Sequence, residues 1–102
     1  MSSDLPNQAP VKITLSAREA IQDTRQANKI PDTYGLRVGI KGGGCSGTFL
    51  LGFDTPTPHD EQHLVEGVSV LIDRRHLMYV LGVTVDYTEG PDGSGFMVVA
   101  NP

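Results

Sequence analysis

Apolar and polar residues alternate in several short segments of the chain, as they do in β-strands that bury one face. This alternation predicts strands at residues 11–15, 34–41, 48–53, 68–72, 83–87 and 96–100. Residues 42–47 are rich in glycine and lie between two of these strands, so we expect them to connect a hairpin through a loop longer than two residues. Residues 54–63 are polar and include Pro56 and Pro58, which predicts a loop.

Two segments have the features of helices. Ser16 and Glu19 are spaced as in a capping box, which predicts a helix over residues 17–28. A second, short helix over residues 74–81 is predicted by Asp73 as its N-cap and by Gly82 as its left-handed C-terminal residue. The expected inward faces of the two helices comprise Ala17, Ala20, Ile21 and Thr24 in the first, and Leu77, Val80 and Leu81 in the second. We therefore predict a mainly β, α+β single domain over residues 11–102, preceded by a flexible arm at residues 1–10.

Size and charge exclude several classes of protein. The chain has 102 residues, enough for one hydrophobic core, and a net charge of −4. Its longest basic cluster is the pair Arg74-Arg75, so no nucleic-acid footprint is expected, and no apolar run approaches the roughly 18 residues of a membrane helix. The N-terminus lacks the features of a secretory signal, and a lone cysteine suits a reducing compartment. We expect a cytoplasmic protein.

Cys45 is the only cysteine, and it stands in the tract Gly42-Gly-Gly-Cys-Ser-Gly47. The glycines leave little bulk around its sulfur, so a ligand could approach it closely. The alternative is an inert, buried cysteine. Lys41 and Arg37 precede the tract, and we hypothesise that their charges favour the thiolate. None of the three histidines has the sequence context of a catalytic partner for Cys45, so no enzyme is predicted.

Two further motifs are weak. The spacing of Gly42, Gly44 and Gly47 matches a dinucleotide-binding fingerprint, but a strand pattern follows where that site requires a helix. His59 and His63 have the spacing of zinc ligands on a helix, but Asp60 stands where the metalloprotease motif has Glu. We interpret the histidine segment as a solvated loop.

Several stretches closely resemble the A-type iron–sulfur carrier family, the HesB-like proteins of the IscA and SufA type. They are residues 13–20, residues 34–47 with their Gly-Cys-Ser-Gly motif, and residues 67–73, 81–87 and 95–102. The resemblance implies a HesB-like domain of short mixed strands that forms a homodimer or tetramer. It also implies binding of iron or of an iron–sulfur cluster, [2Fe–2S] or [4Fe–4S], and transfer of this cargo to recipient apoproteins.

The family pattern uses three cysteines, of which only Cys45 is matched. The other two belong to a Cys-Gly-Cys-Gly tail after an Asn-Pro, and the sequence stops at Asn101-Pro102. Three explanations are open: a mobile tail omitted from the chain, a shortened chain, or a divergent member that has lost ordinary cluster ligation. The stop at Asn-Pro favours the first two.

The sequence thus predicts a non-enzymatic iron–sulfur cluster assembly scaffold or carrier with Cys45 as its metal ligand. Its expected partners are assembly proteins and recipient apoproteins. Because a cluster is ordinarily held by four ligands, one thiol per chain predicts that binding couples to dimerisation. A HesB-fold interaction or regulatory module without a cluster and a thiol redox sensor are the alternatives.

Overall fold

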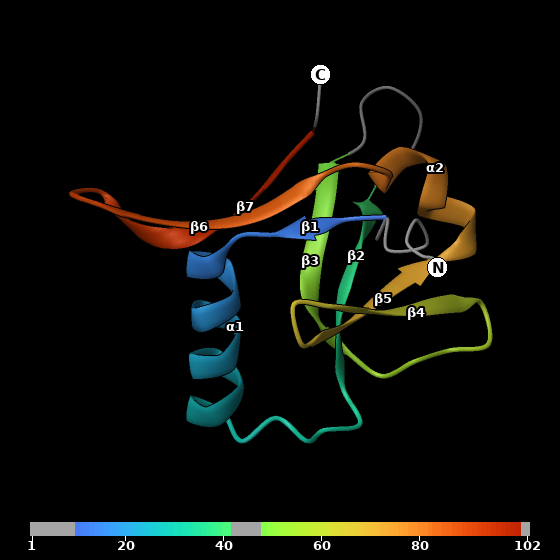
Figure 1. The fold of residues 1–102 in the computed structure, drawn as a ribbon, viewed down its shortest axis with the longest axis horizontal. Helices are drawn as coiled ribbons and strands as arrows, with labels where there is room; N and C mark the ends of the chain where they lie inside the picture. Colours follow the sequence, from blue (N-terminus) through green and yellow to red (C-terminus); the bar gives the residue numbers. More distant parts are fainter. Residues whose placement is uncertain (1–9, 42–47, 101–102) are drawn as a thin grey trace, which may run out of the picture.

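The computed structural model describes residues 10–41 and 48–100, which form two β-sheets and two α-helices (Figure 1). Along the chain, the elements are β1 (Lys12–Ile13), α1 (Leu15–Ala27), β2 (Gly35–Lys41), β3 (Thr48–Asp54), β4 (Asp60–Val65), β5 (Val68–Asp73), the 3₁₀ helix η3 (Arg74–His76), α2 (Leu77–Val80), β6 (Thr84–Gly90) and β7 (Gly93–Val99). The mainly β, α+β architecture predicted from the sequence is confirmed. No helix within the described residues is long and apolar enough to cross a membrane.

The two sheets are mixed. One has the strand order β1-β6-β7, in which β1 runs parallel to β6 and β7 is antiparallel to it. The other has the order β3-β2-β5-β4, with antiparallel outer pairs and a parallel pair, β2 and β5, at its centre. Glu66 and Gly67 have φ angles of 51° and 80° in the tight turn between β4 and β5.

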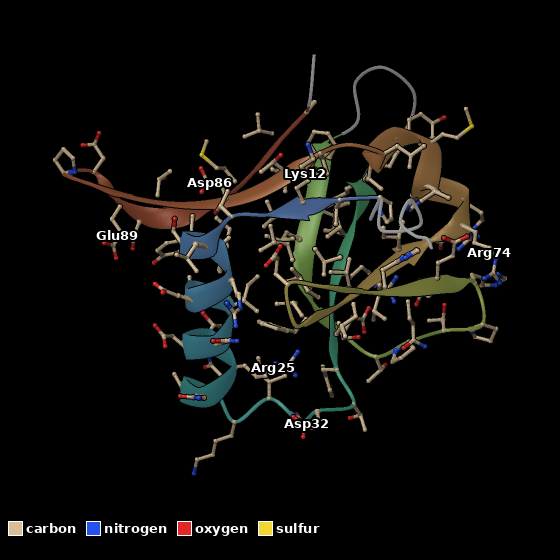
Figure 2. The ribbon with its side chains drawn as sticks, in the orientation of Figure 1. Lys12, Arg25, Asp32, Arg74, Asp86 and Glu89 are labelled. Carbon is tan, nitrogen blue, oxygen red and sulfur yellow. The ribbon has the colours of Figure 1, made fainter. Side chains whose placement is uncertain are left out.

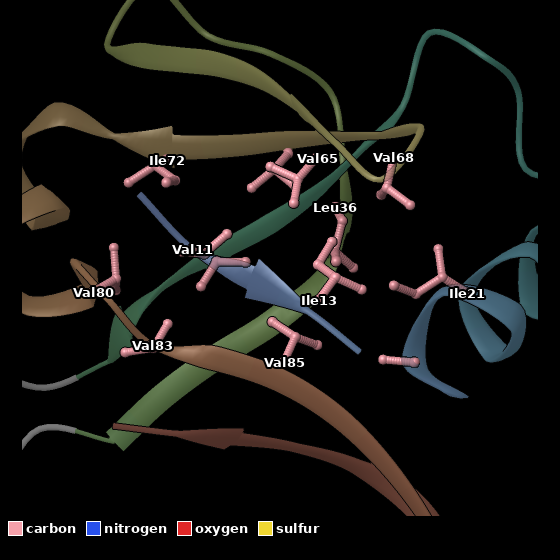
Figure 3. Packing of buried hydrophobic residues seen from close by; sticks show 13 residues of the cluster. Val11, Ile13, Ile21, Leu36, Val65, Val68, Ile72, Val80, Val83 and Val85 are labelled. Atoms are coloured by element: carbon pink, nitrogen blue, oxygen red, sulfur yellow. The ribbon is translucent and has the colours of Figure 1, made fainter. Parts of the chain in front are cut away.

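The hydrophobic core lies between the two sheets and α1 (Figure 3). Each strand contributes the side chains of its inward face, and α1 contributes Ala17 and Ile21. The buried cluster comprises Val11, Ile13, Ala17, Ile21, Leu36, Val38, Val65, Val68, Val70, Ile72, Val80, Val83 and Val85. β-branched residues dominate it, as expected where side chains pack on pleated surfaces.

Helix α1 begins earlier than the sequence predicts. Its N-cap is Thr14, whose Oγ1 accepts a hydrogen bond from the Ala17 backbone N–H at 3.2 Å. The same hydroxyl donates to Asp86 Oδ1 on β6 at 2.8 Å, and Asp86 lies beside the start of α1 in Figure 2. The predicted capping box at Ser16 is therefore wrong. The predicted strand over residues 11–15 is confirmed only at Lys12–Ile13, because Thr14 caps the helix and Leu15 begins it. The bond to Asp86, 72 positions away, helps fix where the helix starts.

We expect Thr14→Ala to lower the free energy of unfolding by about 1–2 kcal/mol, because it removes the cap of α1 and the bond to Asp86. Urea denaturation followed by circular dichroism measures this loss. Ser16→Ala is the matched control, and it should change stability by less than about 0.5 kcal/mol. An equal cost for both variants would show that Ser16 does cap the helix.

Two other predicted segments also need correction. Residues 60–63 are not loop, because β4 begins at Asp60 and pairs with β5 from Asp60↔Asp73 to Val65↔Val68. The turn between β6 and β7 is also shorter than predicted, since β6 extends to Gly90 and β7 begins at Gly93. The long pairing register makes this hairpin the projecting arm of Figure 1.

The second helical segment is η3 followed by α2. The Asp73 side chain accepts from the Arg75 N–H, and Gly82 has a φ of 82°, so both predicted ends are confirmed. Within the predicted packing face, Val80 is buried and Leu77 partly buried, but Leu81 is 57% exposed.

Candidate functional site

The hairpin of β2 and β3 frames the cysteine tract. The two strands pair in register from Gly35↔Asp54 to Lys41↔Thr48, and residues 42–47 connect the last pair. The hairpin predicted from the sequence is therefore confirmed. Cys45 itself lies outside the described residues, so the structure defines the strands that lead to it and not its surroundings.

The inner face of this hairpin is part of the core. Leu36 and Val38 of β2 are buried, and every second residue of β3 (Phe49, Leu51 and Phe53) is partly buried against the core cluster. Arg25 of α1 lies over the Phe53 ring, with its guanidinium carbon 5.2 Å from the ring centroid. Side chains of the core and of α1 thus hold both strands.

Arg37 holds the base of the hairpin from its outer face. Its two terminal nitrogens donate to the two carboxylate oxygens of Asp60, each at 2.7 Å, and its Nε donates to Asp54 Oδ2 at 2.8 Å. The Asp60 side chain is completely buried, and that of Arg37 is 15% exposed. Asp60 accepts a third hydrogen bond from the Thr57 backbone N–H at 2.8 Å. Arg37 therefore joins β2, the end of β3 and the start of β4.

The electrostatics of this network follow from its geometry. The hydrogen bonds from Arg37 lower the pKa of Asp60 to about 2, against the opposing effect of burial. The same guanidinium lowers the pKa of Asp54, and the two carboxylates raise the pKa of Arg37. The charge of Arg37 is balanced by these two carboxylates, and its effect on the Cys45 thiolate remains a prediction. Lys41 is exposed at the end of β2, and its effect on Cys45 remains a prediction.

Nearer to the tract, His76 of η3 packs on the outer face of β2. Its Nδ1 lies 3.1 Å from the position that a Cβ on Gly39 would occupy, so the absence of a side chain at Gly39 permits this close approach. Gly39 pairs with Leu50, only two register positions from the last pair of the hairpin. His76 is half-buried in this position.

A groove of about 300 Å³ runs over this outer face, and His59, Asp73 and Arg75 line it together with Arg37 and His76. The sequence did not predict it. Its residues come from β2, β3, the loop before β4, the end of β5 and η3, and no local pattern relates positions so far apart in the chain.

The zinc spacing of His59 and His63 requires a helix, and neither histidine lies in one. His63 lies in β4, where its Nε2 is 3.0 Å from Glu61 Oε1, and His59 is exposed before that strand. The two histidines therefore do not share one face of a helix, the arrangement that the zinc motif requires. In residues 10–41 and 48–100 there is no group of three or more His, Cys, Asp or Glu side chains that could hold a metal.

The fold and the hairpin are those of a known class of protein. The model of the family described as "Iron-sulphur cluster biosynthesis" matches residues 9–100, almost the whole chain. This chain belongs to that family. The family resemblance that the sequence motifs indicate is confirmed, and the family's function is the predicted one, iron–sulfur cluster assembly.

The relatives by sequence are named iron–sulfur cluster insertion proteins ErpA. That of Actinobacillus pleuropneumoniae serotype 7 is 41% identical over 98 residues, which cover 93% of this chain and 84% of the relative. That of Xylella fastidiosa is 40% identical over 96 residues, covering 91% of this chain and 73% of the relative.

Solved structures agree with the fold. A protein from Aquifex aeolicus, solved by NMR in solution, is 36% identical, with a TM-score of 0.67 and complete coverage of both chains. Escherichia coli SufA, described as involved in biosynthesis of iron–sulfur clusters, has a TM-score of 0.68 at 22% identity and covers 86% of this chain and 77% of its own. IscA with a [2Fe–2S] cluster has a TM-score of 0.68 at 21% identity, with coverages of 88% and 81%. At these identities the last two show the shared fold.

Proposed function

We propose that this chain carries iron or an iron–sulfur cluster on Cys45 and passes it to recipient apoproteins. The observation that supports this most strongly is the family match over residues 9–100, which includes the cysteine tract between two strands of the core hairpin. The relatives named as cluster insertion proteins support the transfer step. In this proposal the protein is a carrier without an enzymatic reaction of its own, and its cargo is bound and released.

The chemistry of ligation determines what Cys45 supplies. Iron binds the thiolate, so cargo binding releases a proton from the Cys45 thiol. One chain offers a single thiolate, whereas a cluster is ordinarily held by four ligands. We propose that a second copy of the chain contributes a second thiolate and that small thiols or other protein ligands complete the set. The glycines on either side of Cys45 keep side chains out of the space that the cargo needs.

Two further proposals concern organisation and compartment. Residues 11–102 act as one carrier domain after an N-terminal arm at residues 1–10, in agreement with the extent of the family match. A chain whose only cysteine must stay reduced to bind cargo belongs in a reducing compartment, for which we propose the cytoplasm.

Cys45→Ser should abolish cluster formation while the fold is retained, because serine removes the only thiol of the chain. The test is anaerobic reconstitution with Fe²⁺ and sulfide, followed by visible absorption and by the content of iron and sulfide per chain. Circular dichroism compares the folds.

The matched control restores a thiol at another place. Cys45→Ser/Ser94→Cys carries one thiol per chain on the exposed start of β7, and we expect it to form no cluster. A Cys45→Ser chain that reconstitutes like the wild type, or equal reconstitution by the double variant, contradicts the proposed site.

A further inference from the structure

The segment formed by η3 and α2 presents one side to the core and the other to solvent. Val80 is completely buried and Leu77 partly buried, and both pack on the core cluster. Met78, Tyr79 and Leu81 are 85%, 54% and 57% exposed. Single exposed apolar residues are ordinary, but a group of large ones in one place marks an interaction site. These three neighbours form such a group.

Two arginines extend this exposed side toward the start of η3. Arg74 and Arg75 precede Met78 by four and three positions, the spacings of neighbours on a helix surface. Both are exposed, and Arg74 lies at the margin of the molecule in Figure 2. We call Arg74, Arg75, Met78, Tyr79 and Leu81 the η3–α2 face. Arginine, methionine and tyrosine are enriched in protein–protein interfaces, and lysine, aspartate and glutamate, which this face lacks, are depleted there.

The guanidinium of Arg74 is held in place while its charge stays unneutralised. Its Nη1 donates to the Asp60 backbone oxygen at 3.3 Å, and its Nη2 donates to that of Pro58 at 2.5 Å. Within residues 10–41 and 48–100, Arg74 forms no ion pair, whereas Arg75 is paired with Asp73. The bonds to the two carbonyls use only part of the N–H donors of the guanidinium. The others are available, in a fixed orientation, to a carboxylate from outside.

We propose that the η3–α2 face is the docking surface for a partner protein that presents an acidic amphipathic helix. Apolar side chains of that helix cover Met78, Tyr79 and Leu81, and one of its carboxylates bonds to the free donors of Arg74. A charge-assisted bond of this kind fixes the orientation of the partner. The flexible methionine adapts to partners of different shape. We take the partners to be recipient apoproteins, and in that respect the inference rests on the proposed function.

Charge and size favour this partner over a membrane or a second copy. The chain has a net charge of −4, so an anionic membrane repels it as a whole. In addition, η3 and α2 have only 3 and 4 residues, whereas many helices that lie in a membrane surface have roughly 20–30. A two-fold contact of the face with itself places arginines opposite arginines. An acidic protein surface meets neither obstacle.

The test uses a synthetic helical peptide with leucines along one side and glutamates flanking them. Its binding to the iron-free chain is measured by fluorescence anisotropy. Arg74→Gln should weaken binding about 10-fold, because it removes the charge-assisted bond. Met78→Ser should also weaken it about 10-fold, because the apolar contact is lost. A peptide with lysines in place of the glutamates should bind to the wild-type chain about 10-fold more weakly.

Two substitutions outside the face are matched controls. Lys29→Gln removes an exposed cation beyond the end of α1, and Leu64→Ser removes a 77% exposed leucine from β4. Each should change the affinity by less than about twofold, because neither position belongs to the face. Circular dichroism compares the folds. Since Met78 is highly exposed, Met78→Ser keeps the test decisive even if Arg74→Gln disturbs the loop before β4.

Equal binding of the acidic and basic peptides, no binding of either, or equal losses in the face variants and the controls overturn the inference. Two other results also overturn it: Met78-dependent binding to phosphatidylglycerol vesicles with no binding of the acidic peptide, and a change of the chain's association state in Met78→Ser, seen by sedimentation equilibrium. The first would assign the face to a membrane and the second to a contact between copies.

Cys45→Ser separates this inference from the proposed function. It should bind the acidic peptide like the wild type, because Cys45 is not part of the η3–α2 face. Loss of the cluster in Cys45→Ser, together with failure of the peptide to bind the wild-type chain, would leave the proposed function standing and end the docking inference. A Cys45→Ser chain that still forms a cluster would contradict the proposed function, and peptide binding would then report on the face alone.

Discussion

Arg37→Met should lower the free energy of unfolding by about 3–5 kcal/mol, one of the two largest effects expected among substitutions in the described residues. The cost arises because methionine leaves the Asp60 carboxylate, whose side chain is completely buried, without its counter-charge. Asp60 would keep its bond from Thr57 N–H and would lose two bonds of 2.7 Å. Equilibrium unfolding in guanidinium chloride at pH 7 measures the change.

The matched control is Arg75→Met. Arg75 also pairs with an aspartate, Asp73, at 2.6 Å, but its own side chain is 69% exposed. Exposed pairs contribute about 0–1 kcal/mol, so Arg75→Met should change stability far less than Arg37→Met. If the two variants lost equal stability, burial of Asp60 would not be the cause.

The same network predicts a dependence on pH. Arg37 lowers the pKa of Asp60 from 3.8 to about 2, so the ionised group stabilises the fold above pH 4. That contribution, about 2 kcal/mol, is lost as the pH falls from 4 toward 2. In Arg37→Met the buried carboxylate prefers to be protonated, so the stability difference between the variant and the wild type should narrow over this interval. A constant difference from pH 7 to pH 2 would contradict the assignment.

Gly35→Ala is expected to destabilise the chain by about 1–3 kcal/mol through overpacking. A Cβ at Gly35 would lie 2.8 Å from Leu71 Cγ and 3.0 Å from the Ser69 backbone oxygen, both on the neighbouring strand β5. Leu71 is 1% exposed and therefore has little room to move. The backbone oxygen cannot yield without disturbing the pairing of β2 with β5, which is the parallel centre of the sheet.

Gly52→Ala provides the control within the same hairpin. No atom lies within 4 Å of a Cβ at Gly52, and its strand position accepts alanine, so stability should stay equal or rise slightly. Thermal unfolding of both variants followed by circular dichroism makes the comparison. An equal loss in both would indicate that the backbone freedom of glycine matters at these positions, and a contact with Leu71 would not explain it.

Elements whose sequence signals are local were predicted correctly. The alternation of apolar and polar residues predicted β2 and β3 because one face of each strand packs on the core. The residues of these faces are Leu36 and Val38 of β2, and Phe49, Leu51 and Phe53 of β3. Gly82 was predicted because its backbone has a positive φ at the end of a helix, which favours glycine. The cysteine tract identified the family, and the family model confirms it.

Features that depend on partners far apart in the chain could not be predicted from local patterns. Helix α1 starts at Leu15 with Thr14 as its cap, because Thr14 also bonds to Asp86, and Asp60 begins a strand where it meets Arg37, 23 positions away. In such cases a local preference of about 1 kcal/mol competes with a long-range hydrogen bond or a buried ion pair, and the stronger interaction sets the structure. Residues of β3 and β7, which belong to different sheets, likewise line one apolar cavity. No local pattern in the sequence encodes this arrangement.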